Sequence, residues 1–301
     1  MKSLWALRNL SWFGLSKRVW KKAGNDHVFG RAAELSYYFL LALFPLLIFM
    51  TSAIGIVLGS DLGTRQQLFN YLASIMPPSA FQLVNATMLE VSQASGGGKL
   101  SFGLLAALWA ASNGMNAITD SLNAAYDVEE TRPWWKQRLV AISLTVSLSV
   151  LILSALVLVV AGGHIGEGIA DAYGFGPAFA VAWKVVQWPF VLLFMILAFA
   201  LIYYFAPDLR KQQWQWLTPG AAIGVALWLL VSLGFRIYLQ FFDSYSKTYG
   251  SLGAVIILML WLYFTGAAVL IGGEINSEIE NAAAERGENE LAPDLHEQAR
   301  T

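Results

Sequence analysis

Residues 30–59 read GRAAELSYYFLLALFPLLIFMTSAIGIVLG, and positions 35–58 carry no charged side chain. At about 1.5 Å of rise per residue, this uncharged run makes a helix ~36 Å long, enough to cross a bilayer with some tilt. Arg31 and Glu34 precede it, three residues apart, and so lie on one helix face at the expected membrane boundary. Pro45 removes a backbone donor in the middle of the run, so we expect a kink there.

The composition is that of a polytopic membrane protein. Of the 301 residues, 57% are hydrophobic and 13% are charged, against roughly 25% charged in an ordinary soluble domain. The net charge of −1 provides no overall field that would attract nucleic acid. The chain contains no cysteine, which excludes disulfides, thiolate metal sites and thiol nucleophiles.

Hydropathy predicts an all-α membrane protein with six transmembrane helices, of which the second is the least apolar. The predicted spans cover residues 35–58, 100–118, 137–161, 183–205, 217–239 and 252–272. We therefore divide the chain into an amphipathic N-terminal segment, a six-helix transmembrane domain and a disordered tail, at residues 1–29, 30–279 and 280–301.

The segments outside the spans differ in character. Residues 1–24 combine apolar and basic side chains, which is typical of an amphipathic helix lying on an anionic membrane surface. The residues expected on its apolar face are Leu4, Leu7, Trp12, Leu15 and Val19. Residues 60–99 predict two short amphipathic helices on the outer side, and residues 162–178 predict a glycine-rich loop.

Lysine and arginine are concentrated in the terminal segments and in the loops on the same side of the membrane. The opposite side holds Arg65, Lys99, Lys184 and Lys247, with Arg236 near the outer end of the fifth span. Because cytoplasmic loops of membrane proteins are enriched in these residues, both termini are expected in the cytoplasm.

A row of polar side chains follows the second predicted span. Asn113, Asn116, Asp120 and Asn123 are spaced by three, four and three residues, so they share one helix face. Such a stripe lines a path or cavity, or it forms hydrogen bonds between packed helices. The sequence leaves both interpretations open.

The fifth and sixth spans carry further polar residues. Arg236 and Gln240 lie four residues apart, and Arg236 either extends outward to the interface, binds an anionic headgroup or pairs with a carboxylate. Glu274 and Glu278, at the end of the sixth span, could pair with basic residues or lie near Glu34. Small-residue spacings, such as Gly220 and Gly224, predict close helix packing.

Motifs of the common enzyme classes are missing from the sequence. It contains no phosphate-binding loop, HExxH or Gly-x-Ser-x-Gly elbow. His164, Glu167 and Asp171 have helical spacing, but the glycines around them argue against a stable helix and hence against a metal site. We expect no catalytic residue, no metal and no cofactor.

Three passages of the sequence are distinctive: GRAAELSYYFLLALFPLLIF, SNGMNAITDSLNAAYDVEETRPWWKQR and YGSLGAVIILMLWLYFTGAAVLIGGEIN. They resemble the YihY / virulence factor BrkB family, within a similarity that covers roughly residues 20–280. The resemblance implies a six-helix bacterial inner-membrane protein with cytoplasmic termini. Family names have included ribonuclease BN, which the residues here do not support, and members are linked to serum resistance or to export of lipid A precursors.

The family has no accepted catalytic motif to transfer, so the resemblance implies only motif positions. These are Glu34, Tyr37, Pro45, Asn116, Asp120, Tyr126, Trp261, Gly273, Glu274 and Asn276.

Our leading hypothesis is a transporter or flippase that moves a lipid or another amphiphile through a polar groove between the first, second, fifth and sixth spans. Its partners would be membrane lipids, not nucleic acid, and protonation of Glu34 or Glu274 is one means of coupling. The candidate residues of the path are Glu34, Tyr37, Pro45, Asn113, Asn116, Asp120, Asn123, Arg236, Gln240 and Glu274.

Two other functions stay open. A non-transporting membrane scaffold predicts that helix packing fills the polar stripe completely. A membrane-associated nuclease predicts metal-dependent RNA cleavage, for which clustered carboxylates are the usual requirement.

Overall fold

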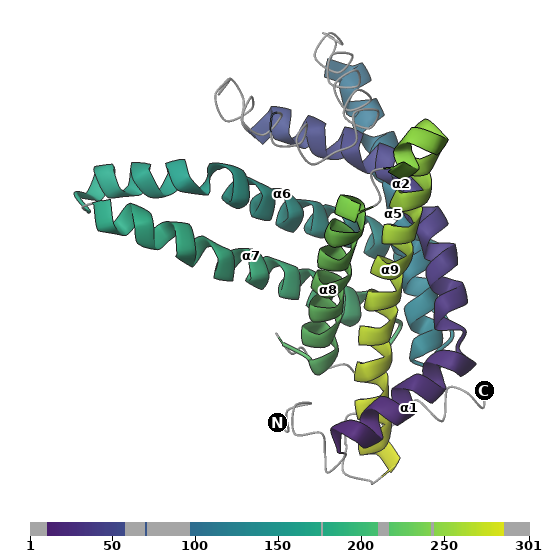
Figure 1. Cartoon of the computed structure of the whole chain (residues 1–301). Coiled ribbons are helices and arrows are strands. Elements are labelled where there is room, and N and C mark those ends of the chain that lie inside the picture. Colours follow the sequence, from purple (N-terminus) through teal and green to yellow (C-terminus); the bar gives the residue numbers. More distant parts are fainter. Residues whose placement is uncertain are drawn as a thin grey trace. The chain divides into compact units, whose positions relative to one another are not determined.

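A computed structural model describes residues 11–57, 70, 97–175, 177–209, 217–241 and 244–285. Throughout these residues the regular structure is helical, which confirms the all-α prediction (Figure 1). The helices are α1 (Trp12–Asn25), α2 (Val28–Val57), α5 (Gly97–Ala125), α6 (Trp134–Tyr173), α7 (Pro177–Phe205), α8 (Pro219–Phe241) and α9 (Ser244–Glu285). The predicted outer amphipathic helices fall almost wholly outside the described residues, as do Leu4 and Leu7.

Four helices contain segments long and apolar enough to cross a membrane: Trp134–Val160, Val181–Phe205, Pro219–Tyr238 and Val255–Ala282. They coincide with the third to sixth predicted spans, so the protein is a polytopic membrane protein. The first two predicted spans fall on α2 and α5. The total of six therefore stays a prediction.

The prediction of a loop at 162–178 is wrong over most of its length, because α6 continues to Tyr173. Two glycines of this segment allow α6 to pack closely against α7. A Cβ at Gly166 would overlap Trp183 of α7, and one at Gly162 would overlap Gln187. In a membrane helix, small residues permit this close approach, and that gain outweighs the low helix propensity of glycine.

The predicted disordered tail also begins too early, because α9 continues to Glu285. Its last turns are anchored: Ile279 and Ala282 are buried, and Arg18 of α1 donates to both carboxylate oxygens of Glu285, at 3.2 and 3.0 Å. Residues 286–301 lie outside the described part of the chain.

The chain forms two compact units, which we treat separately. Unit 1 comprises Met1–Ala42, Ser112–Leu144 and Phe199–Thr301, and unit 2 comprises Leu43–Ala111 and Thr145–Ala198. In unit 2, α6 and α7 run side by side (Figure 1), with Lys184 Nζ 3.9 Å from Glu167 Oε1. Stacked rings of Tyr173, Phe175 and Phe179 continue to Trp183 near the turn of this hairpin.

In unit 1, α1 crosses one end of α9, and α8 lies beside α9 (Figure 1). Leu15 and Val19 of α1 form a buried cluster with Ile275 and Ile279 of α9. Burial of each such side chain stabilises by about 1.5–3 kcal/mol. Trp12, expected on this apolar face, is instead 52% exposed, so the packed face of α1 is narrower than its sequence suggested.

Glycines lie where the helices of unit 1 meet. A Cβ at Gly114 of α5 would come within 3.2 Å of the Cβ of Ala42 in α2. One at Gly266 of α9 would come within 3.3 Å of the Cβ of Leu35, also in α2. Helices α8 and α9 approach each other with their backbones, because a Cβ at Gly220 would overlap the carbonyl oxygen of Gly272.

Gly220→Ala should therefore destabilise the protein by about 1–3 kcal/mol, the usual effect of overpacking. Gly234→Ala in the same helix is the matched control, because a Cβ there meets nothing within 4 Å. Thermal unfolding in detergent should show a lower midpoint for the first variant and no loss for the second. Equal midpoints would contradict the close α8–α9 contact.

Candidate functional site

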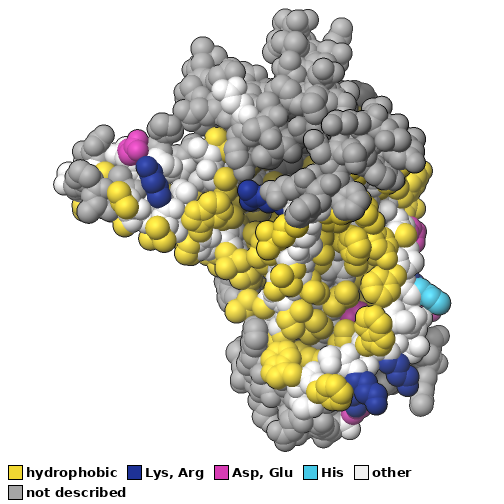
Figure 2. Space-filling view, in the orientation of Figure 1, with side chains coloured by type: hydrophobic (Ala, Val, Ile, Leu, Met, Phe, Trp, Pro, Cys, Tyr) yellow, Lys and Arg dark blue, Asp and Glu magenta, His cyan; other side chains and the backbone are white. Residues whose placement is uncertain are grey.

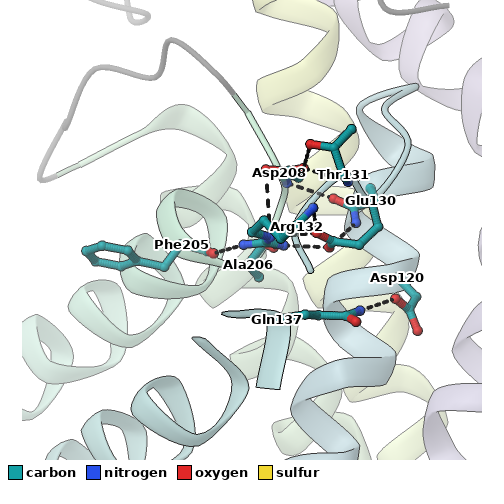
Figure 3. Close-up of polar contacts among 9 residues, drawn as sticks. Asp120, Glu130, Thr131, Arg132, Gln137, Phe205, Ala206 and Asp208 are labelled. Atoms are coloured by element: carbon teal, nitrogen blue, oxygen red, sulfur yellow. Dashed lines mark hydrogen bonds and ion pairs between the residues drawn. The ribbon is translucent and has the colours of Figure 1, made fainter. Parts of the chain in front are cut away.

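A polar cluster joins the end of α5 to the end of α7 around Arg132, in the connection between α5 and α6 (Figure 3). The Arg132 guanidinium donates from Nε to Glu130 Oε1 and from Nη2 to Glu130 Oε2, both at 2.7 Å. It also donates to the carbonyl oxygen of Ala206, at 2.8 Å. A bidentate arginine–carboxylate pair, as formed by Arg132 and Glu130, is among the stronger polar contacts in proteins.

Asp208 and Asn123 complete this cluster. Asp208 Oδ2 accepts from the backbone nitrogen and the hydroxyl of Thr131, at 2.8 and 2.6 Å. Asn123 donates from Nδ2 to Glu130 Oε2 at 3.0 Å, and its Oδ1 accepts from the Asp208 backbone nitrogen at 2.8 Å. Asn123, which we predicted to line a path, thus holds chain segments together.

Two other members of the predicted stripe bond to α6. Arg138 donates from Nη1 to Asn113 Oδ1 at 2.8 Å, and Gln137 donates from Nε2 to Asp120 Oδ1 at 3.1 Å. Of the two interpretations that the sequence left open, interhelical hydrogen bonding therefore applies to Asn113 and Asp120, whereas Asn123 bonds to the connections that follow α5 and α7.

Asn116 differs from the rest of the stripe. Its side-chain Oδ1 is buried, and the described protein offers it no hydrogen-bond partner. The same is true of the hydroxyls of Thr119, one turn further along α5, and of Thr265 in α9. A buried polar atom left in this state costs about 1–3 kcal/mol, so these three positions call for an explanation other than packing.

Glu274 of α9 is the most buried of the predicted path residues, with a fully enclosed side chain. The described residues offer no donor to either of its carboxylate oxygens. At the C-terminal cap of α1, Asp26 Oδ2 is likewise buried and has no hydrogen-bond partner among the described residues. We predicted pairing with a basic residue, and this holds for Glu278, whose Oε2 lies 3.8 Å from Arg18 Nη1.

The remaining predicted path residues are not enclosed in the core of the protein where their side chains are described. Glu34, Tyr37 and Arg236 are exposed. Arg31, which we placed beside Glu34, donates from Nε to the backbone oxygen of Asp26 at 3.1 Å. Pro45 is half-buried within α2, which continues through it, and the side chain of Gln240 lies outside the described part.

Asn276 and Trp261, two of the motif positions implied by the resemblance, lie at contacts between α8 and α9. Asn276 Oδ1 accepts from the Gly220 backbone nitrogen at 2.9 Å, and its Nδ2 donates to the Thr218 hydroxyl at 3.1 Å. Trp261 donates from Nε1 to the Ser232 hydroxyl at 3.3 Å. The Tyr126 side chain is buried.

Comparison with known proteins decides the family. A sequence profile described as virulence factor BrkB matches residues 19–295. The chain belongs to this family. This confirms the resemblance drawn from the sequence, and no solved structure matches the chain.

Relatives of this BrkB-family protein have been named in two ways. YfkH of Bacillus subtilis (strain 168), named as ribonuclease-like, is 41% identical over 248 residues, which cover 82% of this chain and 88% of YfkH. A UPF0761 membrane protein of Stenotrophomonas maltophilia (strain R551-3) is 27% identical over 87% of this chain and 59% of its own length. A UPF0761 membrane protein of Tolumonas auensis is 25% identical over 92% of this chain and 92% of its own length.

Among the described residues of this BrkB-family protein, no group of three or more His, Cys, Asp or Glu side chains could hold a metal ion. In the predicted set His164, Glu167 and Asp171, Glu167 lies near Lys184. The side chains of His164 and Asp171 are outside the described part.

The Arg132 cluster predicts a pH dependence of stability. Burial tends to raise the pKa of Glu130, but hydrogen bonds from Arg132 and Asn123 outweigh it and hold that pKa below 4.5. A lowered pKa contributes stability above 4.5, and this stability is lost as the pH falls through the lowered value. As the pH falls from 4.5 to that lowered value, the unfolding temperature of wild type should thus fall more steeply than that of Glu130→Gln.

Glu129→Gln, at the exposed neighbouring position, is the control and should follow the wild type. Parallel acid profiles for wild type and Glu130→Gln would contradict the role of the Glu130–Arg132 pair.

Proposed function

We propose that this BrkB-family protein moves a lipid or another amphiphile across a bacterial inner membrane, with both termini in the cytoplasm. The observation that carries the proposal is the set of buried polar atoms on α5 and α9 that have no partner in the described protein, at Asn116, Thr119 and Thr265. Polar groups retained within membrane helices usually face a substrate path or a water-filled cavity.

The positions of these atoms fit a single path. A Cβ at Gly273 of α9 would overlap Leu122 of α5, which fixes where the two helices meet. From Leu122, Asn116 lies six residues back along α5, and from Gly273, Thr265 lies eight residues back along α9. At 1.5 Å per residue, they lie ~9 Å and ~12 Å from that contact, so both belong to similar levels of the bundle.

The chemistry of these groups suits the polar part of a lipid. A carboxamide oxygen accepts a hydrogen bond, and a threonine hydroxyl can donate as well as accept. Together they can bind the hydroxyl, ester or phosphate groups of a headgroup in exchange for its hydration. No ATP-binding motif is present in the sequence, so we propose that movement is downhill, ion-coupled or driven by a partner.

The solvent-exposed face of α1 has side chains that favour contact with a membrane surface. Phe13 and Trp20 are 81% and 74% exposed, and Lys17 and Lys21 are exposed beside them. Figure 2 shows hydrophobic side chains next to lysine and arginine side chains at this end of the molecule. A basic face with aromatic rings favours anionic lipid headgroups, which is consistent with a cytoplasmic position for α1.

The scaffold function has support of its own. Asn113, Asp120 and Asn123 bond to other protein groups, as a packed stripe would require. Packing nevertheless leaves the side-chain oxygens of Asn116, Thr119 and Thr265 without hydrogen-bond partners. A scaffold function does not explain why these polar atoms are buried. We therefore place transport first and the scaffold second.

A double substitution, Thr119→Val with Thr265→Val, separates these functions because it removes two hydroxyls and keeps the side-chain shape. In liposomes, we expect the wild-type protein to move labelled lipids between leaflets, and the double variant to do so about tenfold more slowly, the effect of two lost hydrogen bonds. Its unfolding temperature should not fall, because two buried, unsatisfied groups are gone.

Ser121→Ala in α5 is the control, because the Ser121 hydroxyl already donates to the Ala117 carbonyl at 2.8 Å. It should leave lipid movement unchanged. Anionic and zwitterionic lipids should both be tested, and RNA with Mg²⁺ added to the purified protein tests the nuclease function. If the folded wild-type protein moves no lipid of either class, the transport proposal is wrong and the scaffold is favoured.

A further inference from the structure

Two buried polar atoms of α7 lie where the α6–α7 hairpin of unit 2 packs together. One is Oε1 of Gln187, a side chain that is 8% exposed, and the other is Nε1 of Trp183, one turn earlier. The described residues provide no hydrogen-bond partner for either atom. Because most buried polar atoms in proteins are hydrogen-bonded, this acceptor and this donor call for a partner outside the packed helices.

Both side chains point into a stripe of small residues on α6. Gly162, Gly166 and Ala170 are buried and lie four residues apart, so they share one helix face. A Cβ at Gly162 would overlap the carboxamide of Gln187, and one at Gly166 would overlap the indole of Trp183. Close packing explains the small residues, but it does not explain the amide. A leucine would fill the same space without an unpaired oxygen.

The hairpin brings these atoms to the level of the lipid headgroups. The apolar segment of α6 that is long enough to cross a membrane ends at Val160, and that of α7 begins at Val181. At 1.5 Å per residue, Gly162 lies ~3 Å beyond the first segment and Gln187 lies ~9 Å inside the second. With both termini in the cytoplasm, as proposed above, this boundary belongs to the outer leaflet.

An exposed pair of opposite charges lies beside the buried atoms. Lys184 follows Trp183 on α7, and its Nζ is 3.9 Å from Oε1 of Glu167 on α6. Figure 2 shows acidic and basic side chains next to hydrophobic ones on this hairpin. Between positions 161 and 187, the charged residues of the sequence are Glu167, Asp171 and Lys184. The turn thus has no excess of positive charge that would select an anionic headgroup.

These groups match a headgroup that carries an ammonium next to a phosphate. Phosphate oxygens accept hydrogen bonds from the indole of Trp183 and from Lys184. A primary ammonium donates to the Gln187 oxygen and to Glu167. The Lys184–Glu167 pair is exposed and contributes little to stability, so the headgroup can replace it. The terminal torsion of a glutamine is broad, so its oxygen can turn from α6 toward the bilayer.

We propose that the α6–α7 hairpin binds a zwitterionic phospholipid whose headgroup carries a primary ammonium. Exposed apolar side chains next to the buried pair provide surface for its acyl chains, at Val181, Val185 and Trp188. The stacked rings of Phe179 and Trp183 lie at the same boundary, where aromatic side chains are enriched in membrane proteins. Binding at this site rests on the topology of the proposed function but does not require lipid movement.

Native mass spectrometry of the full-length protein measures which added lipid stays bound after release from detergent. Three probes with identical acyl chains are compared: phosphatidylethanolamine, phosphatidylcholine and phosphatidylglycerol. The wild type should bind the first about tenfold more tightly than the second, because a choline group has no N–H to donate to Gln187. It should also bind the first more tightly than the third, which has no ammonium.

Gln187→Leu should lose this preference. It should unfold at no lower a temperature than the wild type, because a buried acceptor without a partner is removed. Gln137→Leu is the matched control, since Gln137 Nε2 donates to Asp120 Oδ1 in unit 1, and it should keep the preference.

Trp183→Phe covers a folding failure of Gln187→Leu, because it keeps an aromatic ring and removes the N–H group. It should weaken the binding of all three lipids alike, since each carries the phosphate. Equal wild-type affinity for the three lipids, a preference that survives Gln187→Leu, or unchanged binding by Trp183→Phe would overturn the proposal. Lipid selectivity without lipid movement would support this site and contradict only the transport proposal.

Discussion

The contact between α8 and α9 at Gly220 and Gly272 is the constraint on which the rest of unit 1 depends. It leaves no room for a Cβ on either helix, and it aligns Asn276 with the first turn of α8. The Tyr203 hydroxyl donates to the Val269 carbonyl at 2.8 Å and so adds the end of α7 to the same point. Contacts of α9 with α1, α2 and α5 then follow along one long helix.

Within this frame the polar residues fall into two groups with different physical roles. Amide and charged side chains near the ends of the helices, around Arg132, bond to one another and to backbone groups, and they fix the connections between helices. Deeper along α5 and α9, the side-chain oxygens of Asn116 and Thr265 are buried with no partner in the described protein. The first group is explained by stability, and the second supports a function that brings polar groups into the bundle.

Much of the fold could be predicted from the sequence because hydropathy and helical periodicity are local properties. The common face of the Asn113 stripe follows from spacing alone, whereas the partner of each member depends on a neighbouring helix: Asn123 contacts Asp208, which is 85 residues away. The glycines between positions 162 and 173 predict a loop because glycine has a low helix propensity. In the structure they lie within α6, where two of them allow close packing against α7.

The central claim is that packing does not fill the space beside the unpartnered residues of α5 and α9, so that water or a polar substrate reaches them. The chain contains no cysteine, so single cysteines can be introduced without removing others. A water-soluble thiol reagent applied to the protein in liposomes should label Thr119→Cys and Thr265→Cys but not Ser121→Cys, whose native hydroxyl is bonded within its own helix. Protection of all three positions would show a fully packed bundle and contradict the account.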